Sequence, residues 1–505
     1  MFLLIVVAAI ILRIYLITRD SVPFAYDMGR DLLWAKDIAF YGIPTLIGPQ
    51  GSIWGVYFGP FWYYFLSIPL LLTGGHPLSA VYATASVIIL AGFLAYILFK
   101  PYFPKIYALT LAIVILFSST LINISTFAFH ANVLPFLSLL MIYFCFLSVI
   151  KNPLFISLAL FSTSLMFHAD PAPAVVFLLI PPFIFIFFKL YKAKDLLKLT
   201  ALSFLAFFLP FIPQVIFELR NNFIETRSLI SYFAGENPSL SGQLPFFQRI
   251  MDRSSLFFTF FKVSFTPNNN FFATLFLILI VFGIYKFLKN TKDKNLLALF
   301  KISALGFVLT YLIFTLVITV EIKNWYLYGV TILFALLIVF AIYGLRNYRK
   351  IVSLFIIIYL VLNTLPFLRN EKKLKSKTDP ATLSNQLAAI DSIYNDAKDL
   401  SFSVYTFTPS IYDLNYQYLF WWRAVKSKRG LPQDFTYLPD QPSYVRNKNV
   451  YATETKTTNT VYLIIENAPE NEFYTSKNWL INFKDYQIVW QKDINGAIKL
   501  EKRVK

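Results

Sequence analysis

Charged residues are scarce in this sequence. Only 14% of its 505 residues are Asp, Glu, Lys or Arg, whereas 57% are hydrophobic and the mean hydropathy is +0.60. A soluble domain carries about 25% charged and about 45–50% apolar residues, so a single water-soluble globule is excluded. Cysteine is nearly absent too, since Cys145 is the only one. A single Cys excludes a disulfide framework and a cysteine-based zinc site.

Nucleotide-binding and hydrolase motifs are also missing. The sequence has no Gly-x-Gly-x-x-Gly, no P-loop, no His-Glu-x-x-His and no Gly-x-Ser-x-Gly. It also lacks the Asp-x-Asp that nucleotide-sugar transferases use to hold a metal diphosphate. With three His residues there is little material for a histidine-rich metal site. We therefore expect no organic cofactor and no obligatory metal, and leave a divalent cation open as an alternative.

Long apolar runs are what the sequence has in abundance. About 20 helical residues cross a hydrocarbon core of about 30 Å, and most of the runs reach that length. The stretch 60–73 is shorter and aromatic, so we interpret it as a helix at the outer membrane interface. The fold class is thus an all-α polytopic membrane protein with about eleven spans. The runs are 1–18, 79–99, 106–124, 133–150, 154–167, 173–188, 200–217, 271–288, 302–320, 325–344 and 351–367.

The loops between these runs sort by charge. One set, near 100–105, 151, 189–198, 286–301 and 346–350, holds many Lys and Arg residues, opposed only by Asp195 and Asp293. The other set holds most of the acids. The positive-inside rule assigns the basic set to the cytoplasm. The net charge of +18 is then mostly topological, and we expect no nucleic-acid partner.

This sorting sets the orientation of the chain. It predicts a multi-pass protein of the plasma membrane, or inner membrane, with a cytoplasmic N-terminus and an extracytoplasmic C-terminal domain. Residues 1–18 have no basic segment and no small-residue cleavage site, so we favour an uncleaved signal anchor over a cleaved signal peptide.

Three segments are expected on the outer side. Loop 19–78 contains an amphipathic helix at 27–41, and loop 218–270 is polar and aromatic. The tail 371–505 has ordinary composition and alternating patterns at 401–407 and 460–465. We interpret the tail as a small α+β domain, with helices at 381–399 and 413–426, after a transmembrane domain at 1–370.

Polar side chains at the outer ends of several runs form one constellation. Charges near a membrane are costly and usually functional, although each residue also has a structural interpretation. The two acids of helix 27–41 could be solvated, the His residues could be interfacial, the Arg and Lys could anchor the chain at lipid headgroups, and Asp170 could cap a helix. The constellation comprises Asp27, Arg30, Asp31, His130, Asn132, His168, Asp170, Arg220, Lys323 and Asn324.

An ordered set of motifs resembles a known family. The segments are Tyr26-Asp-Met-Gly-Arg-Asp31, Gly55-Val-Tyr-Phe-Gly-Pro60 and His130-Ala-Asn-Val-Leu-Pro135. Together they resemble the GT-C-fold polytopic glycosyltransferases of the protein O-mannosyltransferase and aminoarabinose-transferase group, glycosyltransferase family 39 and its relatives. The resemblance covers about residues 1–345. This chain has Asn132 where relatives carry an acid, and Asn324-Trp325 where many have His-Tyr.

The resemblance implies transfer of a sugar from a polyprenyl-phosphate carrier to a glycan, lipid or protein acceptor on the outer face, with inversion. It also implies that Asp27 is the general base, with Asp31 as a second catalytic acid one turn further on. Arg220 and Lys323 are the first candidates to stabilise the departing phosphate. The other candidates for substrate binding are Arg30, Tyr57, His130, Asn132, His168, Asp170 and Asn324.

Two other functions remain open. A transporter or lipid flippase requires polar residues at mid-membrane, yet the runs are nearly free of charge there. A non-catalytic scaffold would bind cell-envelope partners through the tail 371–505, and would be indifferent to changes at Asp27.

Overall fold

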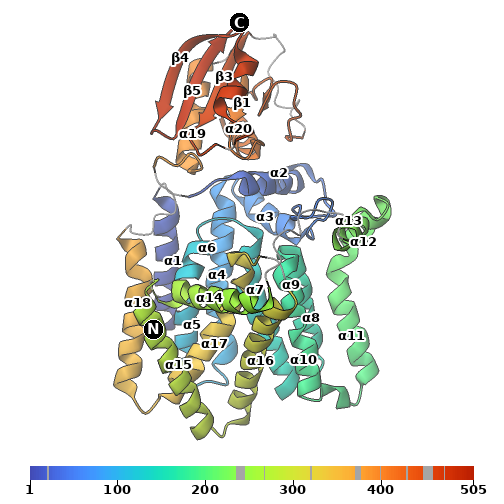
Figure 1. Cartoon of the computed structure of the whole chain (residues 1–505), viewed down its shortest axis with the longest axis vertical. Helices are drawn as coiled ribbons and strands as arrows, with labels where there is room; N and C mark the ends of the chain where they lie inside the picture. The colour runs from blue at the N-terminus through green and yellow to red at the C-terminus, as the bar shows by residue number, and fades with distance from the viewer. Residues whose placement is uncertain are drawn as a thin grey trace.

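The structure is a computed structural model of the whole chain. It describes residues 1–19, 22–234, 245–266, 268–318, 321–369, 377–398, 400–427, 430–446, 459–470 and 472–505. A bundle of long helices forms the lower body, helices that lie across the bundle cover its upper end, and a small sheet domain stands above them (Figure 1).

The bundle consists of the apolar runs that the sequence predicts. Among the described residues, five helical segments are long and apolar enough to cross a membrane, and further apolar helices are shorter. Helices occupy the described parts of the apolar runs, but the number of spans stays a prediction. The bundle helices are α1 (Phe2–Thr18), α4 (Leu78–Phe99), α5 (Lys105–Leu116), α7 (Leu134–Ile150), α8 (Phe155–Ala169), α9 (Pro171–Leu178), α10 (Ile180–Phe187), α11 (Leu196–Phe208), α12 (Ile212–Arg220), α15 (Asn270–Asn290), α16 (Lys294–Leu316), α17 (Val330–Gly344) and α18 (Arg349–Leu368).

Three of the runs are interrupted helices. Run 106–124 breaks at Ser118, whose backbone is extended, and continues as α6 (Ser119–Ile124). Run 173–188 is divided into α9 and α10, and run 200–217 into α11 and α12. Prolines open the second helix in both of these cases, at positions where a missing N–H costs nothing.

Helix α17 forms the centre of the bundle. It is apolar on all sides and buried along nearly its whole length, as expected of a helix surrounded by others. It packs against α15 at backbone distance, because Gly283 and Gly344 have no side chains. A Cβ on Gly283 would lie 2.4 Å from the carbonyl oxygen of Ala341. Small residues allow membrane helices to approach in this way.

The outer layer consists of shorter helices. α2 (Tyr26–Tyr41) confirms the predicted helix at 27–41, and α3 (Phe61–Leu72) is helical as expected for 60–73. The segment 218–270, predicted as a polar and aromatic outer loop, contains two helices that the sequence analysis did not predict, α13 (Ile224–Phe233) and the twenty-residue α14 (Phe246–Phe265). Both α2 and α14 run across the bundle (Figure 1). The turns predicted at 235–242 lie outside the described residues.

The C-terminal domain is α+β, as predicted. Its sheet has the order β2-β1-β3-β5-β4, with β1 parallel to both β2 and β3 and the other pairs antiparallel. The predicted boundary at 370/371 lies outside the described residues. The strands are β1 (Ser403–Phe407), β2 (Phe435–Thr436), β3 (Thr460–Glu466), β4 (Gln487–Ile494) and β5 (Ile498–Val504), and the helices are α19 (Leu383–Ala397), α20 (Leu414–Ser427) and α21 (Ser476–Leu480).

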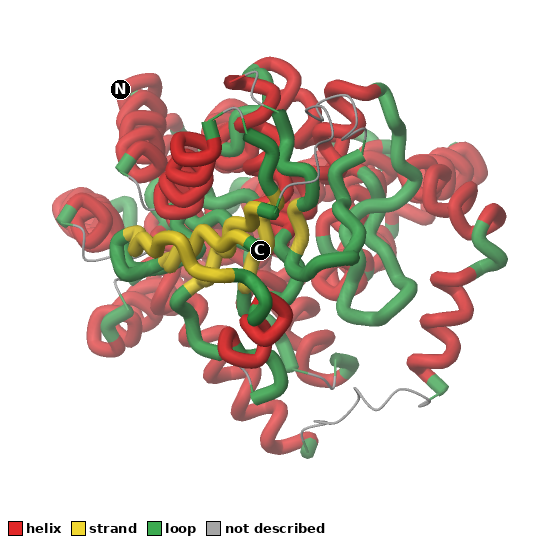
Figure 2. Tube along the Cα trace, turned by 90° about the horizontal axis from the view of Figure 1, so that it is seen from above, coloured by secondary structure: helices red, strands yellow, loops and turns green. Residues whose placement is uncertain are grey.

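This domain is attached to the bundle through α2. The backbone N–H of Phe24 donates to the carbonyl of Ala381 at 2.7 Å, and the hydroxyl of Tyr418 donates to the carbonyl of Gly75 at 2.6 Å. A Cβ on Gly29 would lie 2.3 Å from the backbone of Asn415. Seen from above, the sheet projects over the helical bundle (Figure 2).

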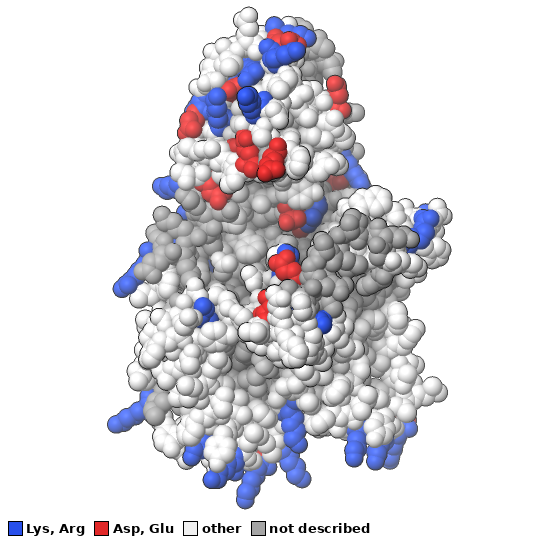
Figure 3. All heavy atoms as spheres, in the orientation of Figure 1, with Lys and Arg blue, Asp and Glu red and all other residues white. Residues whose placement is uncertain are grey.

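The surface charges separate along the long axis. Lys and Arg gather at the end of the bundle that is far from the C-terminal domain, whereas the acids lie on that domain, among further Lys and Arg, and at its junction with the bundle (Figure 3). This is the separation that the loop charges predict. The assignment of the basic end to the cytoplasm remains a proposal.

Candidate functional site

The first turns of α2 hold three charged residues in mutual contact. Nη1 of Arg30 lies 2.9 Å from Oδ1 of Asp27, and Nη2 of Arg30 lies 2.8 Å from Oδ1 of Asp31. Asp27 lies three residues before Arg30 and shares its face of the helix, whereas Asp31 is the next residue along and contacts the same guanidinium. The side chain of Asp27 is 51% exposed, whereas that of Asp31 is 2% exposed.

Asp27 and Asp31 differ in burial, and burial changes the pKa of Asp31. It raises the pKa of Asp31 from 3.8 to about 6, although the charge of Arg30 and the hydrogen bond from Trp62 act in the opposite direction. Burial also disfavours the charged form of Arg30, but the carboxylates of Asp31 and Asp27 outweigh it and raise the pKa of Arg30. Asp31 is thus the inner anchor that holds Arg30, and Asp27 is the accessible carboxylate.

The 3-10 turn η1 (His130–Val133) brings further polar groups to the same region. The positive charge of Arg30 acts on the imidazole of His130, which places η1 near the start of α2. Nδ1 of His130 contacts the carbonyl of Ala169. Asn132 is fully buried and donates to the carbonyls of Ile124 and Phe127 at 2.8 and 2.9 Å.

Asp170 caps a helix, as its structural interpretation predicts. Its carboxylate accepts from the backbone N–H of Ala172 at 3.1 Å, and its second oxygen accepts from the indole of Trp325 at 3.1 Å. Burial raises the pKa of Asp170 to about 7. Trp325 belongs to η5 (Asn324–Leu327) and also packs edge-on against Phe129, next to His130. Asp170 therefore joins α9, η5 and η1.

The loop that precedes α3 covers the two buried His residues. Phe58 packs edge-on against His130, with ring centroids 4.8 Å apart. His168 lies so close to Gly59 that a Cβ there would be 2.1 Å from its Nδ1. The backbone N–H of Tyr57 donates to Glu225 of α13 at 3.2 Å. Tyr57 is therefore close to α13, and its ring packs edge-on against Phe217 of α12.

The expected convergence of Arg220 and Lys323 on Asp27 is not observed. Lys323 is 43% exposed and pairs with Glu321 at 2.7 Å. Arg220 is exposed at the end of α12, and Asn324 is exposed at the start of η5. Within the described residues, neither Arg220 nor Lys323 forms an ion pair with Asp27 or Asp31. Both lie on solvent-facing ends of helices and turns, where water competes for their charge.

Two further residues, one beside Asp31 and one on α14, were not singled out from the sequence. The indole of Trp62 donates to Oδ2 of Asp31 at 2.7 Å. On α14, Nε and Nη1 of Arg249 are buried and have no hydrogen-bond partner among the described residues. The signal for α14 was present, because Phe257, Phe261 and Phe265 recur at helical spacing.

Metal-binding groups do not gather in this region. Across the described ranges, no three His, Cys, Asp or Glu side chains lie close enough together to hold a metal ion. Of the charged residues that the sequence singles out, the structure joins Asp27 and Asp31 through Arg30.

Comparison with known proteins identifies the fold. The structure matches ArnT from Cupriavidus metallidurans, an aminoarabinose transferase, with a TM-score of 0.62 and 9% identity over 99% of this chain and 97% of the ArnT chain. That ArnT structure was solved bound to undecaprenyl phosphate, and the apo form matches equally well, at 10% identity. The chain thus has the GT-C fold.

A second similarity is weaker. The oligosaccharyltransferase of Archaeoglobus fulgidus matches with a TM-score of 0.45 and 13% identity, over 92% of this chain and 68% of that chain. No protein-family model matches the sequence, and no curated protein is detectably similar to it. The predicted resemblance to GT-C glycosyltransferases is confirmed at the level of the fold.

Proposed function

We propose that this chain is a membrane glycosyltransferase. It moves a sugar from a polyprenyl-phosphate carrier to an acceptor hydroxyl on the extracytoplasmic side of the plasma membrane, with inversion at the anomeric carbon. The observation that carries this proposal is the position of Asp27. It is a half-exposed carboxylate, held by Arg30, at the junction of bundle and C-terminal domain. The fold around it matches ArnT, whose structure holds undecaprenyl phosphate.

Asp27 acts as the general base. Its Oδ1 forms an ion pair with the guanidinium of Arg30, and its Oδ2 has no hydrogen-bond partner among the described residues. That free oxygen can take the proton of the acceptor hydroxyl as the new bond to the anomeric carbon forms. The bond from that carbon to the carrier phosphate breaks, and its electron pair goes to the phosphate.

Asp31 orients Arg30 rather than reacting. Because Asp31 is buried and bonded by both Arg30 and Trp62, it cannot reach a substrate. It fixes the guanidinium, which in turn fixes Asp27. The sequence-based assignment of a catalytic role to both acids thus becomes a division of roles, with Asp27 as base and Asp31 as a positioning residue.

The departing phosphate needs a cation. Arg220 and Lys323 are exposed, and Arg30 is already shared by two carboxylates. Arg249 fits better, because its buried N–H groups lack an acceptor and a guanidinium binds phosphate oxygens in a bidentate manner. Arg253, one turn further along α14, is bonded to the carbonyl of Phe314 and to Asp252. It therefore fixes α14 on α16.

A transfer assay tests the function. Purified protein is incubated with polyprenyl-phosphate sugars labelled in the sugar, together with membrane lipids, glycans and peptides as acceptors. We expect release of polyprenyl phosphate and a labelled product whose anomeric configuration is opposite to that of the donor. A product of retained configuration would contradict the single displacement. Quantitative recovery of intact donor with every sugar and acceptor would contradict the function itself.

A further inference from the structure

A cavity lies between the C-terminal domain and the start of α2. It has a volume of about 530 Å³, within the range of small-molecule sites. One wall is formed where the parallel strands β1 and β3 end, at Thr408–Ser410 and Glu466–Pro469. Ligands commonly bind beyond the carboxyl ends of parallel strands. Ala25 and Tyr26, at the start of α2, form the opposite wall.

Two residues that line this cavity, Gln386 and Asn415, have buried amide oxygens with no hydrogen-bond partner among the described residues. Gln386 is fully buried, and its Nε2 donates to the carbonyls of Phe24 and Pro380 at 3.0 and 3.2 Å. These bonds fix the amide and leave Oε1 with no hydrogen-bond partner among the described residues. Oδ1 of Asn415, a residue that is 4% exposed, also has no partner. Buried acceptors rarely stay unpaired, so a ligand that supplies donors fits this site.

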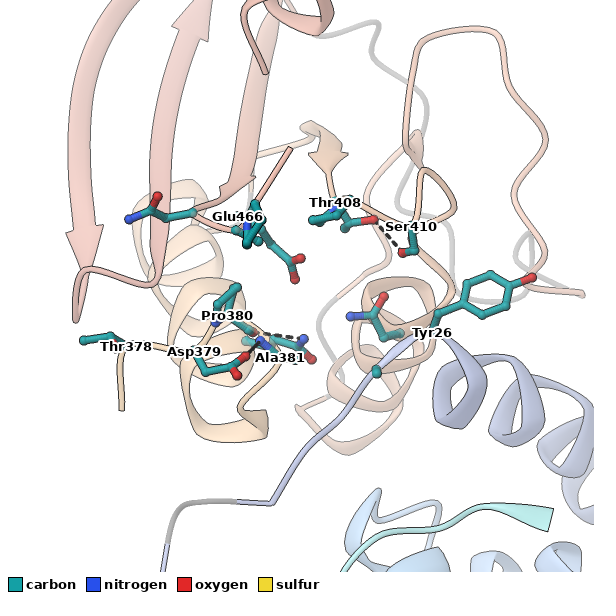
Figure 4. A pocket seen from close by; sticks show the side chains of 15 residues that line it. Tyr26, Thr378, Asp379, Pro380, Ala381, Thr408, Ser410 and Glu466 are labelled. Carbon is teal, nitrogen blue, oxygen red and sulfur yellow. Dashed lines mark hydrogen bonds between the residues drawn. The ribbon is translucent and has the colours of Figure 1, made fainter. Parts of the chain in front are cut away.

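The charges around the cavity restrict the ligand further. Among the described residues, its lining contains two carboxylates, Asp379 and Glu466, and no Lys, Arg or His. Glu466 extends into the cavity from the end of β3 (Figure 4) and accepts from the hydroxyl of Tyr416 at 3.0 Å. A phosphate or carboxylate ligand would be repelled here. An acyl chain would leave the amide oxygens unpaired.

A neutral glycan meets all of these requirements. Its hydroxyl groups are donors at short, regular intervals, which carboxylate and amide oxygens accept. The hydroxyls of Thr408 and Ser410, which bond to one another at 2.9 Å, keep lone pairs that accept from such hydroxyl groups (Figure 4). A peptide would instead pair along an open strand edge, whereas this cavity lies at strand ends.

The cavity is connected to Asp27 through its neighbour in sequence. Tyr26 lines the cavity, and the guanidinium of Arg30 lies 5.8 Å from the centroid of its ring. A molecule held between Tyr26 and the ends of β1 and β3 is thus adjacent to the first turn of α2. We propose that this cavity is the acceptor subsite and that the acceptor is a neutral glycan. This inference rests on the proposed glycosyltransferase function.

The test is a binding measurement on the full chain in lipid nanodiscs, without any polyprenyl donor. The probes are neutral oligosaccharides of glucose, galactose, mannose and N-acetylglucosamine, with mannose 6-phosphate and a mixture of unmodified peptides beside them. We expect saturable binding of at least one neutral oligosaccharide. We expect no saturable binding of mannose 6-phosphate or of the peptides. Saturable peptide binding, or no saturation by any oligosaccharide, would overturn the inference.

Variants locate the binding. Ala468→Trp fills the cavity from its rim and should weaken oligosaccharide binding at least tenfold. Glu466→Gln keeps an acceptor for Tyr416 and should weaken binding severalfold, because the charged acceptor is lost. Glu472→Gln, at an exposed position six residues further along, is the matched control and should leave binding unchanged. Equal binding by wild type and Ala468→Trp would place the ligand elsewhere.

The two proposals fail in different ways. Oligosaccharide binding that Ala468→Trp abolishes, in a protein that never transfers sugar from a polyprenyl donor, would overturn the glycosyltransferase function and the acceptor role while the glycan site remains. Transfer by the wild type with an acceptor KM that Ala468→Trp leaves unchanged would overturn the acceptor subsite alone. Transfer with an acceptor KM raised at least tenfold by Ala468→Trp supports both.

Discussion

The indole N–H of Trp62 donates to Oδ2 of Asp31 at 2.7 Å, and this bond joins α3 to α2 beneath the candidate base. It leaves the other oxygen of Asp31 to accept from Arg30. The donor of a hydrogen bond to a buried carboxylate stabilises its charged form. Trp62 therefore fixes the carboxylate of Asp31. Asp31 in turn fixes Arg30, and Arg30 contacts Asp27.

Asp31 should make stability depend on pH between about 4 and 6. Its pKa is raised from 3.8 to about 6, so in this window the folded state binds a proton that the unfolded state has released. The contribution of Asp31 to stability is therefore present at low pH and is lost as the pH rises through 6. We expect the Tm of the wild type to fall relative to that of Asp31→Asn as the pH rises from 4.5 to 7. A difference that stays constant, or moves in favour of the wild type, would contradict the raised pKa.

Asp170 should be replaceable by Asn but not by Ala. An Asn side chain can accept from Ala172 and Trp325 as the carboxylate does, whereas Ala removes the cap and leaves the Trp325 indole without its acceptor. Loss of a helix cap costs about 1 kcal/mol, and an unpaired buried donor costs about 1–3 kcal/mol. Thermal unfolding in detergent should give a Tm for Asp170→Asn near that of wild type and a clearly lower one for Asp170→Ala. Equal Tm values for both variants would mean that these bonds do not stabilise the fold.

Gly29 should hold the C-terminal domain on α2. A Cβ at this position would lie 2.3 Å from backbone atoms of Asn415, and backbone cannot move aside as a flexible side chain can. Gly29→Ala should therefore separate α20 from α2 and make the C-terminal domain more sensitive to protease than in wild type. Gly74→Ala is the control, since no atom lies within 4 Å of a Cβ there, although its positive φ adds some strain. Equal protease resistance of Gly29→Ala and wild type would mean that the contact is not required.

Arg249 should bind the carrier phosphate. Arg249→Gln removes the charge and keeps a polar side chain, so we expect weaker binding of polyprenyl phosphate by at least tenfold, measured by native mass spectrometry. Lys323→Gln is the control, because Lys323 is exposed and paired with Glu321, and it should bind the lipid as wild type does. If Lys323→Gln weakened lipid binding and Arg249→Gln did not, Lys323 would be the residue that binds the phosphate, as the sequence analysis predicts.

The sequence predicts well those elements whose signal is local. The apolar runs became helices, α2 lies where helical periodicity places it, and the alternating patterns became β1 and β3. The long helix α14 was missed because its polar residues hid a regular row of Phe residues. Its buried face includes Arg253, a residue type that usually marks an exposed face.

The candidate site was predicted only in part, because its charges are set by tertiary contacts. The spacing of Asp27, Arg30 and Asp31 indicates a shared face, but not which acid is buried. Burial depends on Trp62 of α3, thirty-one positions further along the chain. The loop charges predict the depth of Arg220 and Lys323 but carry no information on their lateral distance from α2. Loop charges fix which side of a membrane a residue lies on, not its neighbours.

The central claim is that Asp27 is the base, and the most direct measurement is the single-turnover transfer rate of Asp27→Asn. Asp391→Asn is its matched control, because Asp391 is 46% exposed and paired with Arg423, much as Asp27 is paired with Arg30. General bases contribute about 10²–10⁴-fold to a rate. We predict a loss of that size in Asp27→Asn, with unchanged donor binding, and a rate near that of wild type in Asp391→Asn. A wild-type rate in Asp27→Asn would contradict the account.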